Sequence, residues 1–275
     1  MNQQRSNSLL YALPIWSVLL VFVPLPIFAI VTHFASNTEL PALDECLERL
    51  RDIRQSEQQV GFATYSGEQS TGVSGAKLYW KEFDADDARA LIQVTAPPAR
   101  RGVSLLILQE DQSPPGLHMY LPELRSVRRV TGNTLSGTLL GTDFTYEDFL
   151  HIYGLAGAAR LEQRKDEELN ERQVFVVDME PADEHSSYEM IRSYIDQRWC
   201  VPLKVEFYTK AANLRKTLNV DAGAIKDVNG HHIPIKLEMR DLVQDTRTQV
   251  TVESITVNDE IKDSLFSLSH LRSGH

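Results

Sequence analysis

Residues 203–208 read LKVEFY and residues 233–240 read IPIKLEMR, and these two stretches decide the fold class. In both, apolar and polar side chains alternate without interruption, which is typical of a β-strand with one buried and one solvated face. Similar but less strict runs occur at 76–83, 88–95, 104–109, 117–121, 126–131, 157–165, 172–179, 189–197, 214–222 and 248–257. The connections are too short for the helical crossovers that parallel strands need. The sequence therefore predicts about eleven antiparallel strands in succession.

A sheet of this many antiparallel strands has to curl, and its apolar face then encloses a hollow. We therefore expect a mainly β fold, an open and incomplete antiparallel β-barrel covered by a few α-helices. Three segments could fill the hollow, at residues 39–59, 142–153 and 259–271. The first is predicted as one amphipathic helix, because Leu43, Leu47, Leu50 and Ile53 recur at helical spacing. Residues 37–275 are read as a single domain, since no repeat or long linker interrupts them.

The N-terminus carries a long apolar stretch, LLYALPIWSVLLVFVPLPIFAIVTHF, at residues 9–34. No charged residue lies between Arg5 and Glu39, and the stretch is long enough to cross a membrane as a helix. Residues 1–36 are therefore predicted to be a signal peptide or an N-terminal membrane anchor. Pro14, Pro24 and Pro26 weaken the anchor interpretation because each removes a helical hydrogen bond. Both alternatives stay open.

The charge balance and the cysteines limit the classes of function. Lys and Arg number 28 against 38 Asp and Glu, which gives a formal net charge of -10. A nucleic-acid binder is excluded on this ground, because its affinity would rest on basic residues. Cys46 and Cys200 are compatible with an oxidising compartment, but they supply no disulfide framework. We expect two buried, unpaired thiols, and the sequence leaves their pairing open.

Nothing in the chain indicates an enzyme, a metal site or a cofactor. The eight histidines include no HExxH pair, and the adjacent His231 and His232 would point to opposite faces of a strand. Residues 72–75, GVSG, lack the spacing of a nucleophile elbow. A binding protein is therefore the expected class.

Two segments stand out from ordinary strand sequence. Residues 120–130, YLPELRSVRRV, predict two strands joined by a tight turn, with Arg125, Arg128 and Arg129 in the turn and the second strand. These arginines form either a solvated strand edge or a site for a lipid phosphate or an acidic partner. Residues 141–149, GTDFTYEDF, predict a short helix that Asp143 caps.

Together these segments resemble the LolA/LolB-like family of outer membrane lipoprotein-sorting proteins. The resemblance covers residues 40–271 and rests on the order of the opening helix, residues 91–102, the two segments above, and 195–208 followed by DSLF at 263–266. It departs in the long, proline-rich leader and in Thr142, where a serine is more usual. The resemblance implies a periplasmic, non-enzymatic protein, secreted across or anchored in the bacterial inner membrane, whose half-barrel accepts acyl chains.

The expected function is a carrier that shelters acyl chains of a lipoprotein or a phospholipid-like amphiphile and moves them between envelope membranes. An inner-membrane transporter could supply the cargo. The alternative is a non-enzymatic periplasmic accessory or stress-sensing domain, anchored in the membrane, that binds a protein partner. For the carrier, the arginines at 125, 128 and 129 would meet the headgroup. The hollow is expected to be lined by Leu91, Leu106, Leu108, Met119 and Leu121, and roofed by Phe144 and Phe149.

Overall fold

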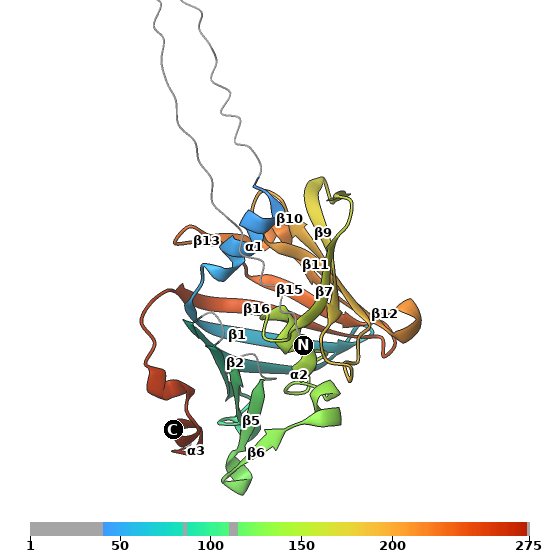
Figure 1. Ribbon diagram of the computed structural model, residues 1–275. Coiled ribbons are helices and arrows are strands. Elements are labelled where there is room, and N and C mark those ends of the chain that lie inside the picture. Colours follow the sequence, from blue (N-terminus) through green and yellow to red (C-terminus); the bar gives the residue numbers. More distant parts are fainter. Residues whose placement is uncertain (1–40, 85–86, 110–114, 274–275) are drawn as a thin grey trace, which may run out of the picture. The chain divides into compact units, whose positions relative to one another are not determined.

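Strands make up most of the part of the chain that the structure describes (Figure 1). The computed structural model describes residues 41–84, 87–109 and 115–273. The strands of this part are β1 (Gln55–Ser66), β2 (Gln69–Asp84), β3 (Asp87–Ala96), β4 (Ser104–Gln109), β5 (Gly116–Leu121), β6 (Ser126–Val130), β7 (Ala158–Gln163), β8 (Glu167–Leu169), β9 (Arg172–Pro181), β10 (Met190–Asp196), β11 (Pro202–Thr209), β12 (Asn213–Val220), β13 (Ile225–Val228), β14 (His231–Pro234), β15 (Lys236–Asp241) and β16 (Thr246–Val257).

Most of these strands belong to one antiparallel sheet of 14 strands, in the order β6-β5-β4-β3-β2-β1-β16-β15-β12-β11-β10-β9-β7, with β8 also paired to β9. The sheet is open, and in the described part of the chain β6 forms one edge while β7 and β8 together form the other. The predicted large, open antiparallel sheet is confirmed, but the strand number of about eleven is too low. The order also differs from a simple succession, because β1 lies beside β16 in the middle of the sheet.

The first predicted helix is too long. Helix α1 (Leu43–Arg51) ends where the leucine stripe ends, and β1 begins at Gln55. Residues 55–59, QSEQQ, carry no apolar stripe of their own. They form a strand because β1 pairs along its length with β2 on one side and β16 on the other. Pairing with distant segments therefore decides the structure here, and local propensity does not.

Residues 233–240, predicted as one strand, are divided between two sheets. His231–Pro234 pairs with β13 in a separate two-stranded hairpin, whereas Lys236–Asp241 lies between β12 and β16 in the main sheet. Pro234 has no N–H to give to a ladder, which fits its place at the end of β14. The β13-β14 hairpin thus projects from the main sheet as a separate flap.

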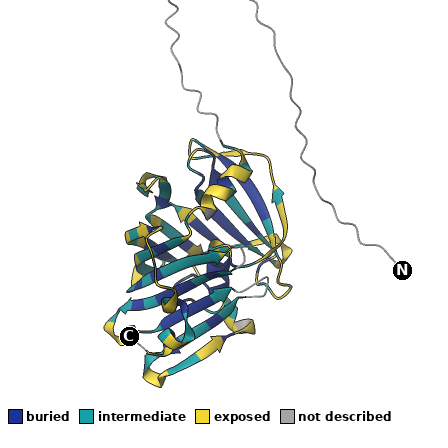
Figure 2. Cartoon of the chain, turned by 60° about the vertical axis from the view of Figure 1, so that its left-hand side comes forward, coloured by how far each residue is buried: buried dark blue, intermediate teal, exposed yellow. Residues whose placement is uncertain are grey.

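The two faces of the main sheet are covered by different segments. Helix α2 (Tyr146–Ile152) packs with the residues around it on one face, called the inner face here, against a cluster that includes Ile92, Ile107 and Met239. The opposite, outer face of β3, β4 and β5 is covered by the C-terminal segment, where the 3-10 turn η6 (Asp263–Phe266) leads to α3 (Leu268–Ser273). Buried and exposed residues alternate along many of the strands (Figure 2). The end of the chain, predicted to fill the hollow, instead covers the outer face.

Cys46 and Cys200 form a disulfide with Cα atoms 4.8 Å apart, so the expectation of unpaired thiols is wrong. Cys46 lies in α1 and Cys200 in the turn between β10 and β11. Both are buried beside Phe175, Val177 and Ile195, with Leu43 and Leu47 of α1 packed on this cluster. The bond joins residues that are 154 positions apart, and no sequence pattern reveals that proximity.

The predicted leader at residues 1–36 lies outside the described residues. Within 41–84, 87–109 and 115–273, no helix has the length and apolar character needed to span a membrane.

Candidate functional site

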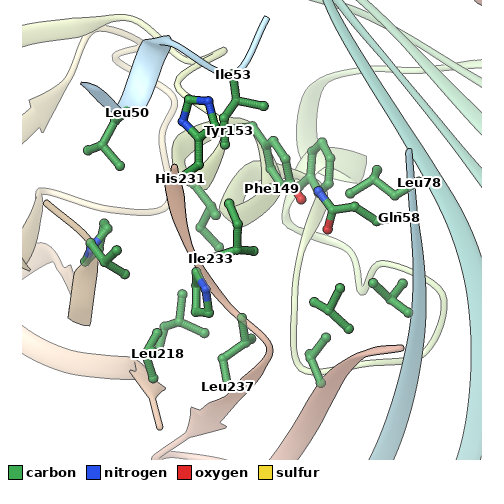
Figure 3. Close-up of a pocket in the computed structure, with 18 of the residues that line it drawn as sticks. Leu50, Ile53, Gln58, Leu78, Phe149, Tyr153, Leu218, His231, Ile233 and Leu237 are labelled. Carbon is green, nitrogen blue, oxygen red and sulfur yellow. The ribbon is translucent and has the colours of Figure 1, made fainter. Parts of the chain in front are cut away.

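A cavity of about 560 Å³ lies on the inner face of the sheet. Strands from both halves of the sheet contribute to its wall, through Val60, Leu78, Ile92, Leu218, Leu237 and Val250. The side chains drawn in Figure 3 converge on this space from the sheet, from α2 and from the β13-β14 hairpin. The wall is therefore mostly aliphatic, as expected where one parity of each curled strand faces inward.

Aromatic side chains from α2 and the residue after it form the floor of the cavity. Phe149 and Tyr153 stack with ring centroids 4.3 Å apart, and Trp80 packs 5.8 Å from Tyr153. Burial raises the pKa of the Tyr153 hydroxyl, which is therefore neutral at physiological pH. Phe149 and Tyr153 therefore present an uncharged surface to the cavity.

A buried polar network holds α2 against the sheet. Lys216 of β12 donates to Asp148 Oδ2 at 2.7 Å and to the Asp143 carbonyl oxygen at 2.7 Å. The Tyr188 hydroxyl donates to Asp148 Oδ1 at 2.5 Å, and burial, followed by the charge of Asp148, raises its pKa. Asp148 is completely buried, so these bonds compensate a charge that water does not reach.

The predicted helix cap is wrong by two residues. Thr145 is the N-cap: its Oγ1 accepts from Asp148 N, and Asp148 accepts from Thr145 N, which makes a capping box. Asp143 lies before the helix and instead accepts hydrogen bonds from the hydroxyls of Thr246 and Thr248 in β16. The signature segment therefore ties the floor of the cavity to the central strands.

Glu147 links α2 to the loop that precedes β10. It accepts from Ser186 Oγ at 2.5 Å and from the Ser187 amide at 3.0 Å. Burial raises the pKa of Glu147, but hydrogen bonds with His151, Ser186 and Ser187 outweigh it and leave the pKa below its usual value. Glu147 is thus ionised at neutral pH and links α2 to Ser186 and Ser187.

Polar side chains gather where α1 approaches the cavity. Arg49, Asp52, His231 and His232 line it there, together with Leu50 and Ile53 of the α1 region. Trp199 stacks on His232 with centroids 5.6 Å apart, and the Arg172 guanidinium lies 3.7 Å from the Trp199 centroid. The disulfide at Cys200 holds α1 beside this group. An apolar interior with a polar and aromatic mouth suits an amphiphile.

The predicted lining residues divide between the two faces. Phe144 and Phe149, predicted to roof the hollow, line the cavity. Leu91, Leu106 and Leu108 do not, because they belong to the outer-face cluster under Phe266 and Leu271. The neighbours Ile92, Leu105 and Ile107 take the inward positions instead. Strand β4 is apolar on both parities, so the sequence could not tell its two faces apart. In β3, Leu91 shares its parity with Arg89 and Gln93, so alternation there favoured Ile92 for the inner face.

Met119 and Leu121 are half-buried on β5 and do not line the cavity; Met119 packs against the inner-face cluster. Arg128 and Arg129 lie on opposite faces of the edge strand β6, opposite Met119 and His118 respectively, as the alternation predicts. Arg125 lies in the turn before β6 with φ 45°, so it does not share a strand face with Arg129. All three arginines are exposed, and none lines the cavity.

Sequence reasoning missed the mouth of the cavity. Arg49, Trp199, His231 and His232 come from a helix, a tight turn and a hairpin that are distant in sequence. The dipeptide Asn229-Gly230 is typical of a tight hairpin turn, but nothing local in the sequence indicates that this hairpin closes over the inner face.

A family model described as uncharacterized protein-like matches residues 86–273. The chain belongs to this family. No curated protein matches the sequence. Among solved structures, an outer membrane lipoprotein-sorting protein domain from Vibrio parahaemolyticus has 23% sequence identity and a TM-score of 0.74, covering 83% of this chain and 96% of that chain.

Two further structures have the same fold. A DUF1329 family protein from Desulfovibrio piger has a TM-score of 0.75 at 17% identity, over 83% of this chain and 97% of that chain. A LolA superfamily protein from Nitrosomonas europaea has a TM-score of 0.64 at 18% identity, over 84% and 99%. The fold is therefore LolA-like, and the resemblance seen in the sequence is confirmed.

Proposed function

We propose that this protein is a periplasmic carrier that shelters an acyl chain of a lipoprotein or phospholipid-like amphiphile and moves it between envelope membranes. The observation that carries the proposal is the apolar cavity of about 560 Å³ with its polar mouth. A methylene group is about as large as a water molecule, whose share of liquid volume is about 30 Å³, so the cavity holds on the order of 20 such groups. It thus fits about one long acyl chain, whereas a carrier of two or three chains would need a larger cavity volume.

The energetics favour sheltering such a chain. Each methylene group moved from water into an apolar interior contributes about 0.8 kcal/mol. A single acyl chain anchors a protein to a membrane only weakly and reversibly. A carrier that covers one chain can therefore compete with the membrane for it and still release it, with no covalent step.

In this proposal residues 37–275 are the lipid-binding domain, and residues 1–36 deliver it to the periplasm as a signal peptide or an anchor. The donor is the inner membrane, directly or through a transporter. Similarity in fold to lipoprotein-sorting proteins supports the proposal without naming the cargo.

A filled cavity is the direct test. Leu237→Trp places an indole at the wall that Leu237 of β15 forms (Figure 3). Val73→Trp adds the same group to β2 at a position that is 73% exposed and outside the cavity, and it serves as the control. We expect an apolar fluorescent probe to bind the parent and the Val73 variant, to be displaced by phospholipid or lipopeptide, and to bind the Leu237 variant at least about tenfold more weakly, because the blocked volume removes buried methylene groups.

Mass spectrometry of an organic extract of the purified protein identifies the natural amphiphile. Absence of saturable probe uptake by the folded parent protein would refute the carrier. Equal loss of uptake in both tryptophan variants would show that the cavity is not the binding site.

A further inference from the structure

The arginines of this protein fall into two groups. Most of those described form an ion pair with a carboxylate: Arg49, Arg54, Arg89, Arg160, Arg164, Arg172, Arg192, Arg215, Arg240 and Arg247. Among the arginines whose side chains the structure describes, those without one are Arg100, Arg101, Arg125, Arg128, Arg129, Arg198 and Arg272. All of these except Arg198 belong to η1, β6, α3 or the residues beside them.

Contacts show that these arginines share one end of the sheet. Arg101 follows the 3-10 turn η1 (Pro98–Arg100) and precedes Gly102, which lies so close to Pro122 that a Cβ would be 3.3 Å from the proline Cγ. Pro122 begins the turn η2 (Pro122–Leu124) that leads to Arg125. The two arginine-bearing turns are therefore neighbours.

The C-terminal helix adds a further cation to the same end. Arg129 pairs in register with His118, and α3 packs near β4, β5 and β6. Burial and the charges of Arg129 and Arg272 lower the pKa of His118. His118 is thus flanked by two arginines, and no carboxylate from the described residues pairs with either.

The local charge is opposite to that of the whole protein. Glu123 is the single acidic residue at positions 115–132, against three arginines, in a chain of net charge -10. Most arginines described elsewhere in the protein form an ion pair with a carboxylate, whereas those at this end of the sheet form none with a described carboxylate. A partner that brings negative charge would balance this local positive charge.

An apolar side chain projects among these charges. Leu124, at the end of η2, is 54% exposed and directly precedes Arg125. A large exposed apolar residue beside several arginines matches the interfacial region of a bilayer, where phosphates lie above acyl chains.

We propose that Leu124 and the surrounding arginines, here called the basic edge, dock the protein onto an anionic lipid surface. The arginines occupy both faces of β6 and two adjacent turns, so they spread over an edge and do not line a groove shaped for one acidic peptide. A bilayer offers phosphates across such a width, and each cation near an anionic membrane contributes independently. This inference concerns a different surface from the cavity, and it holds whether or not the cavity carries lipid.

A tryptophan in place of Leu124 reports contact of this residue with the membrane. Leu124→Trp is mixed with vesicles that carry brominated acyl chains, and the signal of the parent protein, which includes Trp16, Trp80 and Trp199, is subtracted. We expect quenching with phosphatidylglycerol and phosphatidylcholine mixed vesicles and none with phosphatidylcholine alone. Val73→Trp, which is exposed on β2, is the control and should not be quenched.

Removal of charge tests the arginines. In the Leu124→Trp background, Arg125→Gln, Arg128→Gln and Arg129→Gln together should weaken binding to the anionic vesicles on the order of 100-fold, about fivefold for each arginine. The control removes the same charge at exposed lysines without ion pairs, by Lys165→Gln, Lys226→Gln and Lys236→Gln, and should change binding little. Added salt should weaken the parent's binding, because it screens exposed charges.

Three results would overturn the inference. Equal weakening by the arginine and lysine variants would mean that net charge alone matters. Absence of quenching at residue 124, or equal quenching at residue 73, would exclude docking through Leu124. Binding of soluble polyglutamate at the arginines without any vesicle quenching would assign the edge to an acidic protein. None of these results affects uptake of an apolar probe by the cavity, so the two proposals fail separately.

Discussion

At the scale of single residues, Asp148 and Lys216 form the most deeply buried charged pair for which a contact is described. Their side chains are 0% and 6% exposed, and the Nζ to Oδ2 distance is 2.7 Å. Removing one charge from such a pair leaves the other buried without compensation, which is much worse than losing an exposed pair. The pair also fixes the helix that carries Phe149, so it links the stability of the fold to the floor of the cavity.

Lys216→Met is expected to lower the free energy of unfolding by about 3–5 kcal/mol, because Asp148 would lose its counter-charge in the interior. Arg240→Gln is the matched control: it breaks an ion pair with Glu238 in which Arg240 is 49% exposed. It should change the free energy of unfolding by only about 0–1 kcal/mol. Urea unfolding of both variants measures the difference. Equal effects would show that the buried pair has no special role.

At the scale of elements, the disulfide adds a covalent link between α1 and the turn before β11, beyond the chain connection from α1 to β1. Its apolar contacts are few, with Leu43 and Leu47 packed near Cys46 and Leu50 41% exposed. The bond closes a loop of 154 residues, so it restricts the unfolded chain strongly. We therefore expect α1 to depend on this bond more than on its own packing.

Cys46→Ser combined with Cys200→Ser is expected to lower the free energy of unfolding by about 2–5 kcal/mol. In the native state the same variant should lose protection of the α1 amides in hydrogen exchange, while the amides of β1 and β16 keep theirs. The parent protein without reductant is the reference. Unchanged exchange in α1 would mean that packing alone holds the helix.

The strands and helices also show which parts of the fold could be predicted from the sequence and which could not. Strand β11 follows from the alternation in the sequence, and its apolar residues Leu203, Val205 and Phe207 are buried on one parity. In β4 the run from Leu105 to Leu108 is apolar at every position, so parity carried no information and the outer-face residues were taken for cavity lining. The short α1 and the long β1 were confused because pairing with β16 acts across almost the whole chain. The cysteine pair and the cavity mouth depend on the same kind of distant contact.

At the scale of the whole molecule, the sheet has two covered faces with separate tasks. The inner face carries the cavity, whereas the outer face is sealed by the C-terminal segment through Phe266 and Leu271, each 1% exposed. Leu91 and Leu106 beneath them are fully buried. Stability contributed by the outer face should therefore be separable from binding at the inner face.

Phe266→Ala is expected to destabilise the protein by about 3–5 kcal/mol, because it leaves a hole against the outer face. Below the unfolding temperature, the affinity for an apolar probe should stay within about twofold of the parent's, since no cavity residue is touched. Thermal unfolding and probe titration on the same sample measure both quantities. Loss of probe affinity in the folded variant would show that the two faces are coupled.

The position of β1 beside β16 also sets the order in which the molecule can be completed. Arg247 at the start of β16 donates to the Gly67 carbonyl oxygen at the end of β1, across 180 residues of chain. On either side of the β1-β16 pair, most strands that are neighbours in the sheet are also neighbours in sequence, so their hairpins can form early. The β1-β16 pairing that joins these two halves of the sheet cannot form until residues 246–257 have been made, and distant pairings of this kind slow folding. A chain that folds from its N-terminus therefore presents β1 as an unpaired edge until the last strand arrives, and this is the interval in which it most needs protection from aggregation.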